Sequence, residues 1–493
     1  MLFSTLTFFV FLPLAFVLYW FVFKKNLSIQ NAFLLVASYV FYGWWSWQFI
    51  GLLVLSTVID YSFGFLVASP NKKKARIFLW LSIINNLGIL FLFKYFNFFS
   101  NEFKELMQCF GWNVNPLVLK WALPVGISFY TFHGMSYVFD IYRGLQKPVK
   151  SFVDYAVFVS FFPLLVAGPI ERANHLLPQV QKQRLFSYRQ ALEGCRLILW
   201  GLFKKIIIAD TLAPIVDGLF EHPEKESAYA LFLGMIGFSI QIYGDFSGYS
   251  DMALGIAKLF GFELLSNFRV PYLSRNIAEF WRRWHISLSS WFRDYLYIPL
   301  GGSRNGKWMA VRNTMIIFLV SGFWHGASWN FLIWGGLHGL AFLPLLLLNR
   351  TKQLGNSVVA QYQSLPSLTE LAQVFFTFLF ITGTWVFFRI TEFSKAILFF
   401  NHLFSNALHH PMQFLHRPTA KQVTDLSLLL IPLFLVLSLI GDWHLRHDER
   451  TLRVPANALV RHSLYFILFT VCLVKLIITA VLATPTNFIY FQF

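Results

Sequence analysis

The segment SGFWHGASWNFLIWGGLHG, residues 321–339, places His325 and His338 where no other ionisable side chain occurs. From Asn313 to Asn349 the sequence contains no Asp, Glu, Lys or Arg. A run of this length can cross a bilayer more than once, and a titratable side chain at membrane depth is usually kept for a pathway, a proton relay or chemistry. A neutral imidazole there can take a proton from a hydroxyl. The alternative for a single histidine is a structural one, hydrogen bonded to a neighbouring carbonyl.

A second histidine lies in the segment 279–304, EFWRRWHISLSSWFRDYLYIPLGGSR, which is both aromatic and charged. On one helix, an apolar stripe would form from Trp281, Trp284, Leu288, Trp291 and Tyr295, opposite Arg282, Ser289 and Arg293. His285 falls on the seam between the two faces. The spacing predicts an amphipathic helix at an interface or around a cavity, ended by Pro299 and Gly301-Gly302. An interfacial helix that binds lipid headgroups is the alternative.

Two carboxylates, Asp245 and Asp251, lie in QIYGDFSGYSDMALG at the end of an apolar run. Buried carboxylates need partners, and we expect the arginines of the segment 279–304 to supply them. The other possibility is a carboxylate that orients a catalytic histidine. The structural role is the favoured one.

The composition is that of a helical membrane protein. Of 493 residues, 57% are hydrophobic and 13% are charged, about half the usual soluble fraction. The net charge of +17 comes from basic residues in short loops, where they set topology, and no nucleic-acid motif accompanies them. Three distant cysteines indicate neither a disulfide framework nor a zinc site. We predict no bound metal or cofactor.

Charge-free runs predict an all-α polytopic fold of about 11–13 transmembrane helices, plus helices that enter without crossing. Residues 27–59 and 313–349 are each long enough for two helices, and 155–170 for one. Residues 1–23 read as a retained first helix rather than a removed signal peptide. Basic loops at residues 24–25, 72–76 and 143–150 are cytoplasmic if the N-terminus lies outside. The Trp44-Trp45-Ser46-Trp47 turn then lies at the outer interface.

The residues also restrict the chemistry. The sequence contains no G-x-S-x-G elbow, no P-loop and no H-E-x-x-H motif. An acyl thioester is activated enough to be attacked by a hydroxyl without a metal, so acyl transfer to oxygen fits two intramembrane histidines. A transporter that relays protons through the same histidines is the non-enzyme alternative. It should show inverted repeats and paired broken helices, and the sequence shows neither.

WRRWHISLSSWFRDYLYIPLGG and SGFWHGASWNFLIWGGLHG resemble the membrane-bound O-acyltransferase family, in its bacterial alginate O-acetylase branch. QIYGDFSGYSDMALG and the opening LFSTLTFFVFLPLAFVLYW resemble that branch as well. The resemblance implies a ring of helices around a funnel and a narrow tunnel, with His325 as the catalytic histidine and His285 as the second polar position. Secondary or tunnel-lining positions are His338, Trp324, Asn330, Asp245 and Tyr249.

The resemblance also implies an activity. An acetyl group would leave a cytoplasmic thioester, acetyl-CoA, and cross the bacterial inner membrane to O-acetylate a cell-surface polysaccharide such as alginate, through a serine-hydrolase-like partner. Transfer of D-alanyl or another acyl group from a carrier protein is the alternative. We expect residues 1–493 to form one domain in membrane lipid, with core motifs in 241–340. Arg282, Arg283 and Arg293, with Lys204-Lys205, could bind the donor phosphates, or hold headgroups and the carboxylates of Asp245, Asp251 and Asp294.

Overall fold

The computed structural model describes residues 1–304, 306–351, 355, 357–409, 425–447, 457–482 and 489. Within these ranges the chain consists of helices, turns and irregular segments, and no strand occurs, which confirms the predicted all-helical class. The chain divides into two compact units. Unit 1 is Met1–Cys195 with Ala253–Leu265, and unit 2 is Arg196–Met252 with Ser266–Phe493. Each unit is described by itself.

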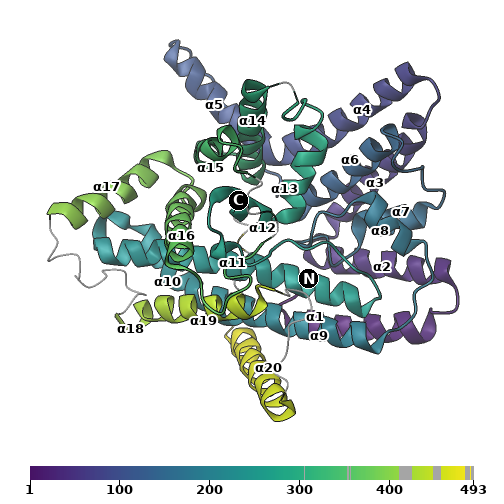
Figure 1. Cartoon of the computed structure of the whole chain (residues 1–493). Helices are drawn as coiled ribbons and strands as arrows, with labels where there is room; N and C mark the ends of the chain where they lie inside the picture. The colour runs from purple at the N-terminus through teal and green to yellow at the C-terminus, as the bar shows by residue number, and fades with distance from the viewer. Residues whose placement is uncertain are drawn as a thin grey trace. The chain divides into compact units, whose positions relative to one another are not determined.

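Unit 1 is built from eight helices that lie wholly within it (Figure 1). They are α1 (Leu6–Val17), α2 (Leu27–Ser46), α3 (Gln48–Val67), α4 (Lys72–Leu90), α5 (Phe96–Cys109), α6 (Ile127–Tyr142), α7 (Phe152–Ser160) and α8 (Ala173–Val180). Short π-helical turns, Leu18–Val22 and Phe91–Tyr95, follow α1 and α4. The side chains of Asn26 and Asn71 accept backbone N–H groups at the starts of α2 and α4. The basic residues 24–25 precede the capped α2, whereas 72–76 form the first turns of α4 itself.

Unit 2 holds the histidine motifs. Its helices are α10 (Asp210–Glu221), α12 (Ile277–Arg283), α13 (Ile286–Phe292), α14 (Lys307–His325), α15 (Trp329–Leu347), α16 (Leu368–Arg389), α17 (Phe393–His409), α18 (Asp425–Leu428), α19 (Leu430–Leu445) and α20 (Ala458–Val481). Two π-helical segments, η3 (Phe203–Ala209) and η6 (Arg293–Tyr297), and two 3-10 turns, Pro223–Lys225 and Pro271–Leu273, complete it. Two further helices, α9 (Tyr188–Leu202) and α11 (Ala228–Leu259), contribute residues to both units.

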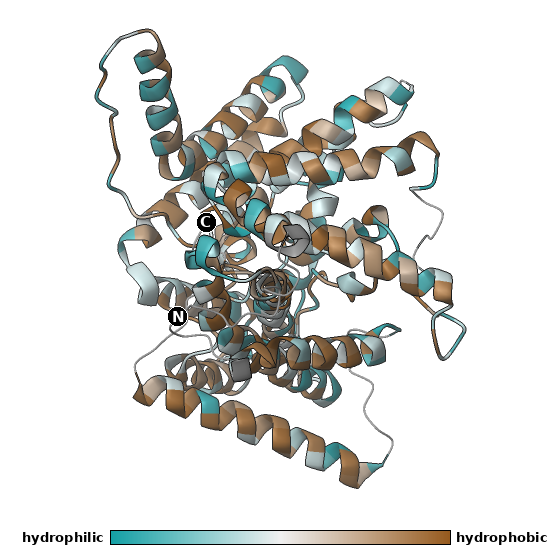
Figure 2. Cartoon of the chain, turned by 90° about the vertical axis from the view of Figure 1, so that its left-hand side faces the viewer, coloured by the Kyte–Doolittle hydropathy of each residue, from teal (hydrophilic) through white to brown (hydrophobic). Residues whose placement is uncertain are grey.

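Six stretches of the described chain are long and apolar enough to cross a membrane. They are Gln48–Val67, Lys72–Cys109, Ala228–Leu259, Trp329–Leu347, Leu368–Arg389 and Ala458–Val481. Two shorter apolar helices span Leu6–Val22 and Leu430–Leu445. Hydrophobic residues predominate along the long helices, which agrees with a multi-pass membrane protein (Figure 2).

The expected 11–13 spanning helices exceed this number. Several charge-free runs fold into elements too short to cross, and residues 155–170 are the clearest case. Helix α7 ends at Ser160, and the next stretch, 161–172, is buried without regular helix. Irregular backbone at membrane depth is tolerated where protein surrounds it, and hydropathy alone does not distinguish such a segment from a helix.

The predicted pair of helices in 313–349 is confirmed and forms a hairpin in unit 2. Glycines bring α14 and α15 into backbone contact. A Cβ atom at Gly322 would lie 2.2 Å from the carbonyl oxygen of Phe331, and one at Gly335 would lie 2.3 Å from that of Phe318. Small residues permit this close approach between membrane helices. The hairpin fixes where His325, the last residue of α14, is presented.

Candidate active site

His285 lies at a break between two short helices of unit 2. Helix α12 ends at Arg283, α13 begins at Ile286, and His285 adopts the left-handed conformation with φ 45° and ψ 52°. The expected single helix over this segment is therefore wrong. A left-handed residue leaves the three- and four-residue spacing of the aromatic side chains intact, so periodicity could not reveal the break. His is among the few non-glycine types enriched in this conformation, which is otherwise unfavourable.

The break directs the aromatic stripe inward. Trp281, Trp284, Leu288, Trp291 and Tyr295 are all buried. The ring of Trp284 packs 5.0 Å from that of Trp385 on α16, and the ring of Phe246 on α11 lies 4.7 Å from His285. The segment thus forms an aromatic core around a histidine rather than an interfacial helix.

The structure brings His285 and His325 together. Their ring centroids are 6.3 Å apart, although the residues are distant in sequence. The Trp324 ring lies 6.0 Å from His285 and 4.8 Å from His325, so this indole contacts both imidazoles. Both histidines are buried, with exposed fractions of 0% and 3%. Two imidazoles at this separation can act on one small reacting group placed between or beside them.

The environments of the two imidazoles differ. Neither ring nitrogen of His285 has a hydrogen-bond partner within the described part of the chain, and burial lowers its pKa to about 3. It is therefore neutral and keeps one N–H and one acceptor nitrogen available. His325 ends α14, where the helix dipole favours a positive charge. An imidazolium that forms transiently is better supported at His325 than at His285.

His338 is held at both nitrogens. Its Nδ1 accepts from the indole N–H of Trp281 at 3.2 Å, so the proton is on Nε2, which donates to the Thr384 hydroxyl at 3.0 Å. Thr384 in turn donates to the carbonyl of Ile381 at 2.8 Å. His325 and His338 lie on separate helices, α14 and α15. The ring of Trp334 lies 5.3 Å from that of His325 and 4.9 Å from that of His338.

The two carboxylates pair with lysines rather than with arginines. Lys205 Nζ lies 2.7 Å from both Asp245 and Asp210, and Lys204 Nζ lies 2.7 Å from Asp251. The expectation that arginines neutralise Asp245 and Asp251 is therefore wrong. Both lysines are buried, so the expectation that they bind donor phosphates is not supported either. Glycines bring the end of α9, which continues into η3, close to α11, since a Cβ atom at Gly201 would lie 2.4 Å from the carbonyl oxygen of Gly248.

The three arginines have separate partners. Arg283 donates to Glu279 at 2.9 Å and to the carbonyl of Ser357 at 2.6 Å. Arg293 is exposed and pairs with the neighbouring Asp294 at 2.7 Å. Pairing with this carboxylate was one of the alternatives to donor binding. Arg282 donates to the carbonyl of Thr351 at 2.5 Å. Among the described residues, Arg282 is the one of the three without an ion pair to a carboxylate, although the charge of Glu279 also acts on it.

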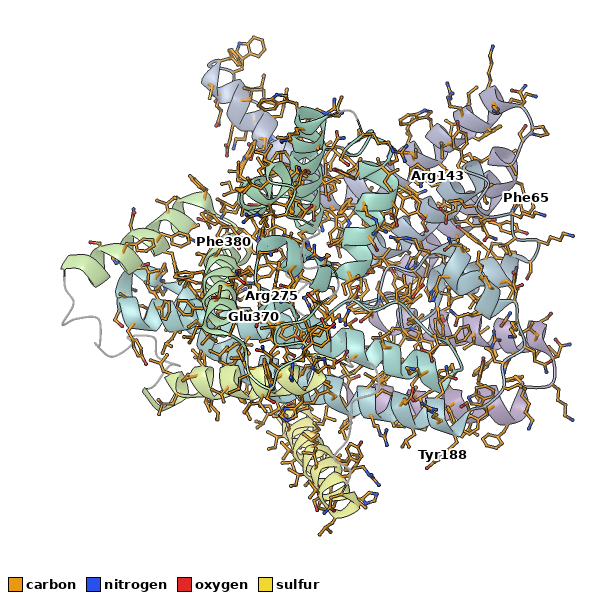
Figure 3. All side chains as sticks on the ribbon, in the orientation of Figure 1. Phe65, Arg143, Tyr188, Arg275, Glu370 and Phe380 are labelled. Atoms are coloured by element: carbon orange, nitrogen blue, oxygen red, sulfur yellow. The ribbon has the colours of Figure 1, made fainter. Side chains whose placement is uncertain are left out.

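Glu279, which sequence reasoning missed, organises the basic cluster. Its buried carboxylate accepts from Arg275 at 3.0 Å as well as from Arg283. Arg275 also reaches Glu370 at the start of α16, 2.9 Å away, and the two are neighbours in Figure 3. The i,i+4 spacing of Glu279 from both arginines was a usable signal.

The remaining predicted positions are all buried in unit 2. Tyr249 lies on α11, and Trp324 precedes His325. Asn330 lies in the first turn of α15, where its side-chain amide donates to the carbonyl of Ile390 at 2.5 Å. This contact joins α15 to the end of α16, so Asn330 also has a structural use.

A further histidine–carboxylate group lies in unit 1, outside the predicted set. The buried Glu171 accepts from the backbone of Leu265 at 2.6 Å and contacts Nδ1 of His175 at 2.7 Å. Its own N–H donates to Nε2 of His133 at 3.1 Å. Glu171 and His175 are four residues apart on the sequence, a spacing that could have drawn attention to them. The contacts hold the irregular 161–172 stretch in place.

Several known proteins are similar to this chain in sequence. The model of the membrane-bound O-acyltransferase family matches residues 39–391. A protein named probable alginate O-acetylase from Azotobacter vinelandii is 40% identical, over 82% of this chain and 78% of its own length. A peptidoglycan O-acetyltransferase from Helicobacter pylori is 37% identical, over 80% of this chain and 78% of its own. A teichoic acid D-alanyltransferase from Bacillus subtilis is 32% identical over 44% of this chain and 57% of its own.

Proposed function

The chain belongs to the membrane-bound O-acyltransferase family, and from this premise we propose that it moves an acetyl group from acetyl-CoA toward a cell-surface polysaccharide such as alginate. The enzyme is a multi-pass membrane O-acyltransferase. The observation that carries the proposal is the buried pair of His325 and His285, whose rings lie 6.3 Å apart.

In the proposed reaction His325 is the general base. It takes the proton of the acceptor hydroxyl while the oxygen attacks the thioester carbonyl. The tetrahedral intermediate collapses, the C–S bond breaks, and the imidazolium returns the proton to the departing thiolate. Protons therefore balance within the site. The position of His325 at the end of α14 supports the charged state that this step requires.

His285 has a different task in this mechanism. A neutral imidazole with no competing hydrogen bond can donate to the carbonyl oxygen as negative charge develops on it. Trp324, in contact with both rings, excludes water from the space beside them. His338 holds the ring of Trp281 in position. It does not touch the reacting atoms, because Trp281 and Thr384 occupy both of its nitrogens.

The donor phosphates need fixed cations. We assign this task to Arg282, because Arg283 is held by Glu279 and Arg293 by Asp294. Arg282→Ala should then raise the KM for acetyl-CoA with thermal stability almost unchanged, whereas Arg283→Ala should destabilise the protein. Equal KM values for the wild type and Arg282→Ala would exclude the assignment.

The proposal also includes the orientation of the chain in the membrane and its partner protein. The N-terminus lies outside the inner membrane of a bacterium, residues 1–493 act as one functional domain, and a serine-hydrolase-like partner receives the acetyl group on the outer side. The three basic loops support this orientation, and relatives named for alginate and peptidoglycan support a polymer as the final acceptor.

The test supplies purified protein and its serine-hydrolase-like acceptor partner with labelled acetyl-CoA or, separately, with a carrier protein charged with labelled D-alanine. We expect turnover with acetyl-CoA, its loss in His325→Ala, and a large decrease in His285→Asn, which keeps the preference for the left-handed conformation. Thermal unfolding and monodispersity are the folding controls. Wild-type turnover by a folded His325→Ala protein would contradict the mechanism. Transfer from the charged carrier alone would favour the D-alanyl activity of the Bacillus subtilis relative.

A further inference from the structure

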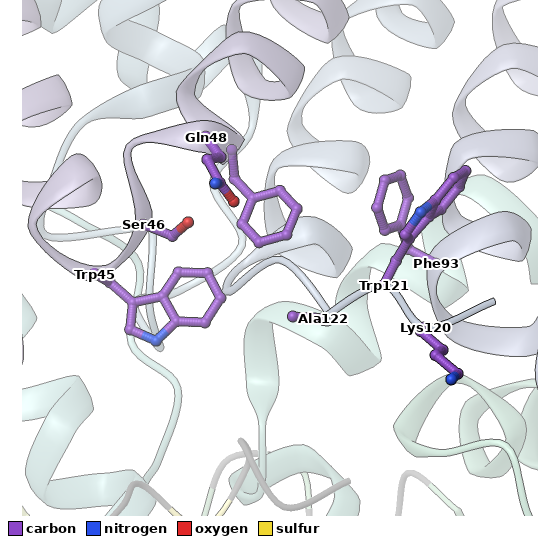
Figure 4. Close-up of a pocket in the computed structure, with 8 residues that line it drawn as sticks. Trp45, Ser46, Gln48, Phe93, Lys120, Trp121 and Ala122 are labelled. Atoms are coloured by element: carbon purple, nitrogen blue, oxygen red, sulfur yellow. The ribbon is translucent and has the colours of Figure 1, made fainter.

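An aromatic pocket opens in unit 1. It has a volume of about 540 Å³ and is lined by Trp45, Ser46, Gln48, Phe49, Phe93, Lys120, Trp121 and Ala122. Figure 4 shows Trp45, Ser46 and Gln48 on one side and Phe93, Trp121 and Lys120 on the other. The Trp45 and Phe49 rings are stacked 5.7 Å apart, and the Phe93 and Trp121 rings lie 5.4 Å apart. The volume falls within the range of small-ligand sites.

The far wall of the pocket is held in place by Asn97. Its side chain donates to the carbonyl of Leu119 at 2.9 Å and accepts from the N–H of Leu119 at 2.8 Å. This pair of bonds fixes an otherwise irregular segment where Lys120 and Trp121 follow. The pocket is therefore a built feature of unit 1 and does not depend on free movement of the loop.

The chemistry of the lining is amphiphilic. Lys120 is the charged side chain in the lining, and the aromatic rings supply apolar walls. Large apolar side chains that neighbour the lining in sequence are exposed: Trp44 by 62%, Trp47 by 74% and Leu117 by 66%. Gln48, which also lines the pocket, begins the candidate span Gln48–Val67, so the pocket lies at the end of a membrane helix. Tryptophans gather at this depth, where one end of a ligand is wet and the other apolar.

We propose that this pocket binds the headgroup region of an anionic phospholipid. The phosphate pairs with Lys120, and the upper acyl chain lies on the rings of Trp45, Phe49 and Trp121. A soluble acidic saccharide such as an oligouronate carries an anion but has no apolar chain to cover the exposed Trp44, Trp47 and Leu117. Free phosphate makes no use of the aromatic walls. The lipid is in the leaflet opposite the basic loops, since the Trp44–Trp47 turn joins α2 to α3 on the side away from residues 24–25 and 68–76.

The test measures lipid retention on the purified, delipidated full chain by native mass spectrometry. Short-chain phosphatidylglycerol, phosphatidylcholine of the same chain length, inorganic phosphate and an oligouronate are supplied separately. We expect preference for phosphatidylglycerol, and a decrease in its affinity of about fivefold in Lys120→Ala, the factor expected for one lysine near a membrane surface. Lys120→Arg should bind as the wild type does, and Trp121→Ala should weaken both lipids.

Lys147→Ala is the matched control, since Lys147 is exposed in unit 1 but does not line the pocket. Equal binding of the two lipids by the wild type, or equal loss in Lys147→Ala and Lys120→Ala, would overturn the proposal. So would binding of phosphate or oligouronate as tight as that of phosphatidylglycerol. The measurement is independent of acetyl transfer, so its failure leaves the proposed function untouched.

Discussion

At the scale of single residues, hydrogen bonds distinguish His338 from His285 in unit 2. The sequence indicated that His325 and His338 were unusual, because both lie in a charge-free run. It could not show that Trp281 and Thr384 occupy the nitrogens of His338, since those partners lie 57 and 46 residues away. The ranking of His325 above His338 came from the family resemblance, and the contacts supply a physical reason for it.

Removing the partner of His338 should lower stability. Thr384→Val keeps the shape of the side chain but leaves the Nε2–H of His338 without an acceptor, at a cost of about 1–3 kcal/mol. We expect a lower unfolding temperature and a partial loss of activity. Thr377→Val, a half-buried position on the same helix, is the matched control. Unchanged stability in Thr384→Val would mean that His338 is not held as described.

The buried lysine–aspartate pairs should contribute to the stability of the protein. Lys204→Met leaves Asp251 with an uncompensated charge and should destabilise the protein by about 3–5 kcal/mol. Lys204→Met combined with Asp251→Leu should recover most of that loss, since both charges are then absent. Thermal unfolding of the four variants in a double-mutant cycle measures the coupling. Additive losses would show that the pair is not coupled.

At the scale of elements, close packing and local breaks decide the geometry of the site. Hydropathy found the two helices of the 313–349 hairpin, because each is a long apolar run. It did not find the break at His285, nor the short α7, because a left-handed residue and a buried irregular segment both keep the apolar pattern. Such features depend on tertiary neighbours that a single apolar pattern does not specify.

The hairpin gives a sharp comparison between adjacent glycines. A Cβ atom at Gly335 would lie 2.3 Å from the backbone oxygen of Phe318, whereas one at Gly336 would lie 3.7 Å from a methyl of Leu319, an ordinary contact. Gly335→Ala should push α14 from α15, lower the unfolding temperature and reduce acyl transfer by displacing His325. Gly336→Ala should be neutral or slightly stabilising, as alanine favours helix. The same effect from both substitutions would contradict the packing.

At the scale of the whole molecule, composition and loop charge predicted the class and an orientation. The all-helical membrane class is confirmed, and six stretches of the described residues are long and apolar enough to cross a membrane. The orientation makes its own prediction. Single cysteines at Lys73 and Lys147, in a background that lacks Cys109, Cys195 and Cys472, should be shielded from a membrane-impermeant thiol reagent added to intact cells. A cysteine at Ser46 should react. Labelling of the Lys73 position from outside would reverse the topology.

The division of the chain also has a consequence for synthesis. The segment Ala253–Leu265 belongs to unit 1, although the residues that precede it, Arg196–Met252, belong to unit 2. The hydroxyl of Tyr19 donates to the carbonyl of Phe260, and the carboxylate of Glu171 accepts from the backbone N–H of Leu265. These two residues therefore lack their hydrogen-bond partners until Phe260 and Leu265 have been synthesised. The ribosome must therefore translate past residue 265 before the first unit can close. A nascent chain that stops earlier would leave the polar side chains of Tyr19 and Glu171 without these partners, which would make the incomplete protein a target for chaperones and proteases.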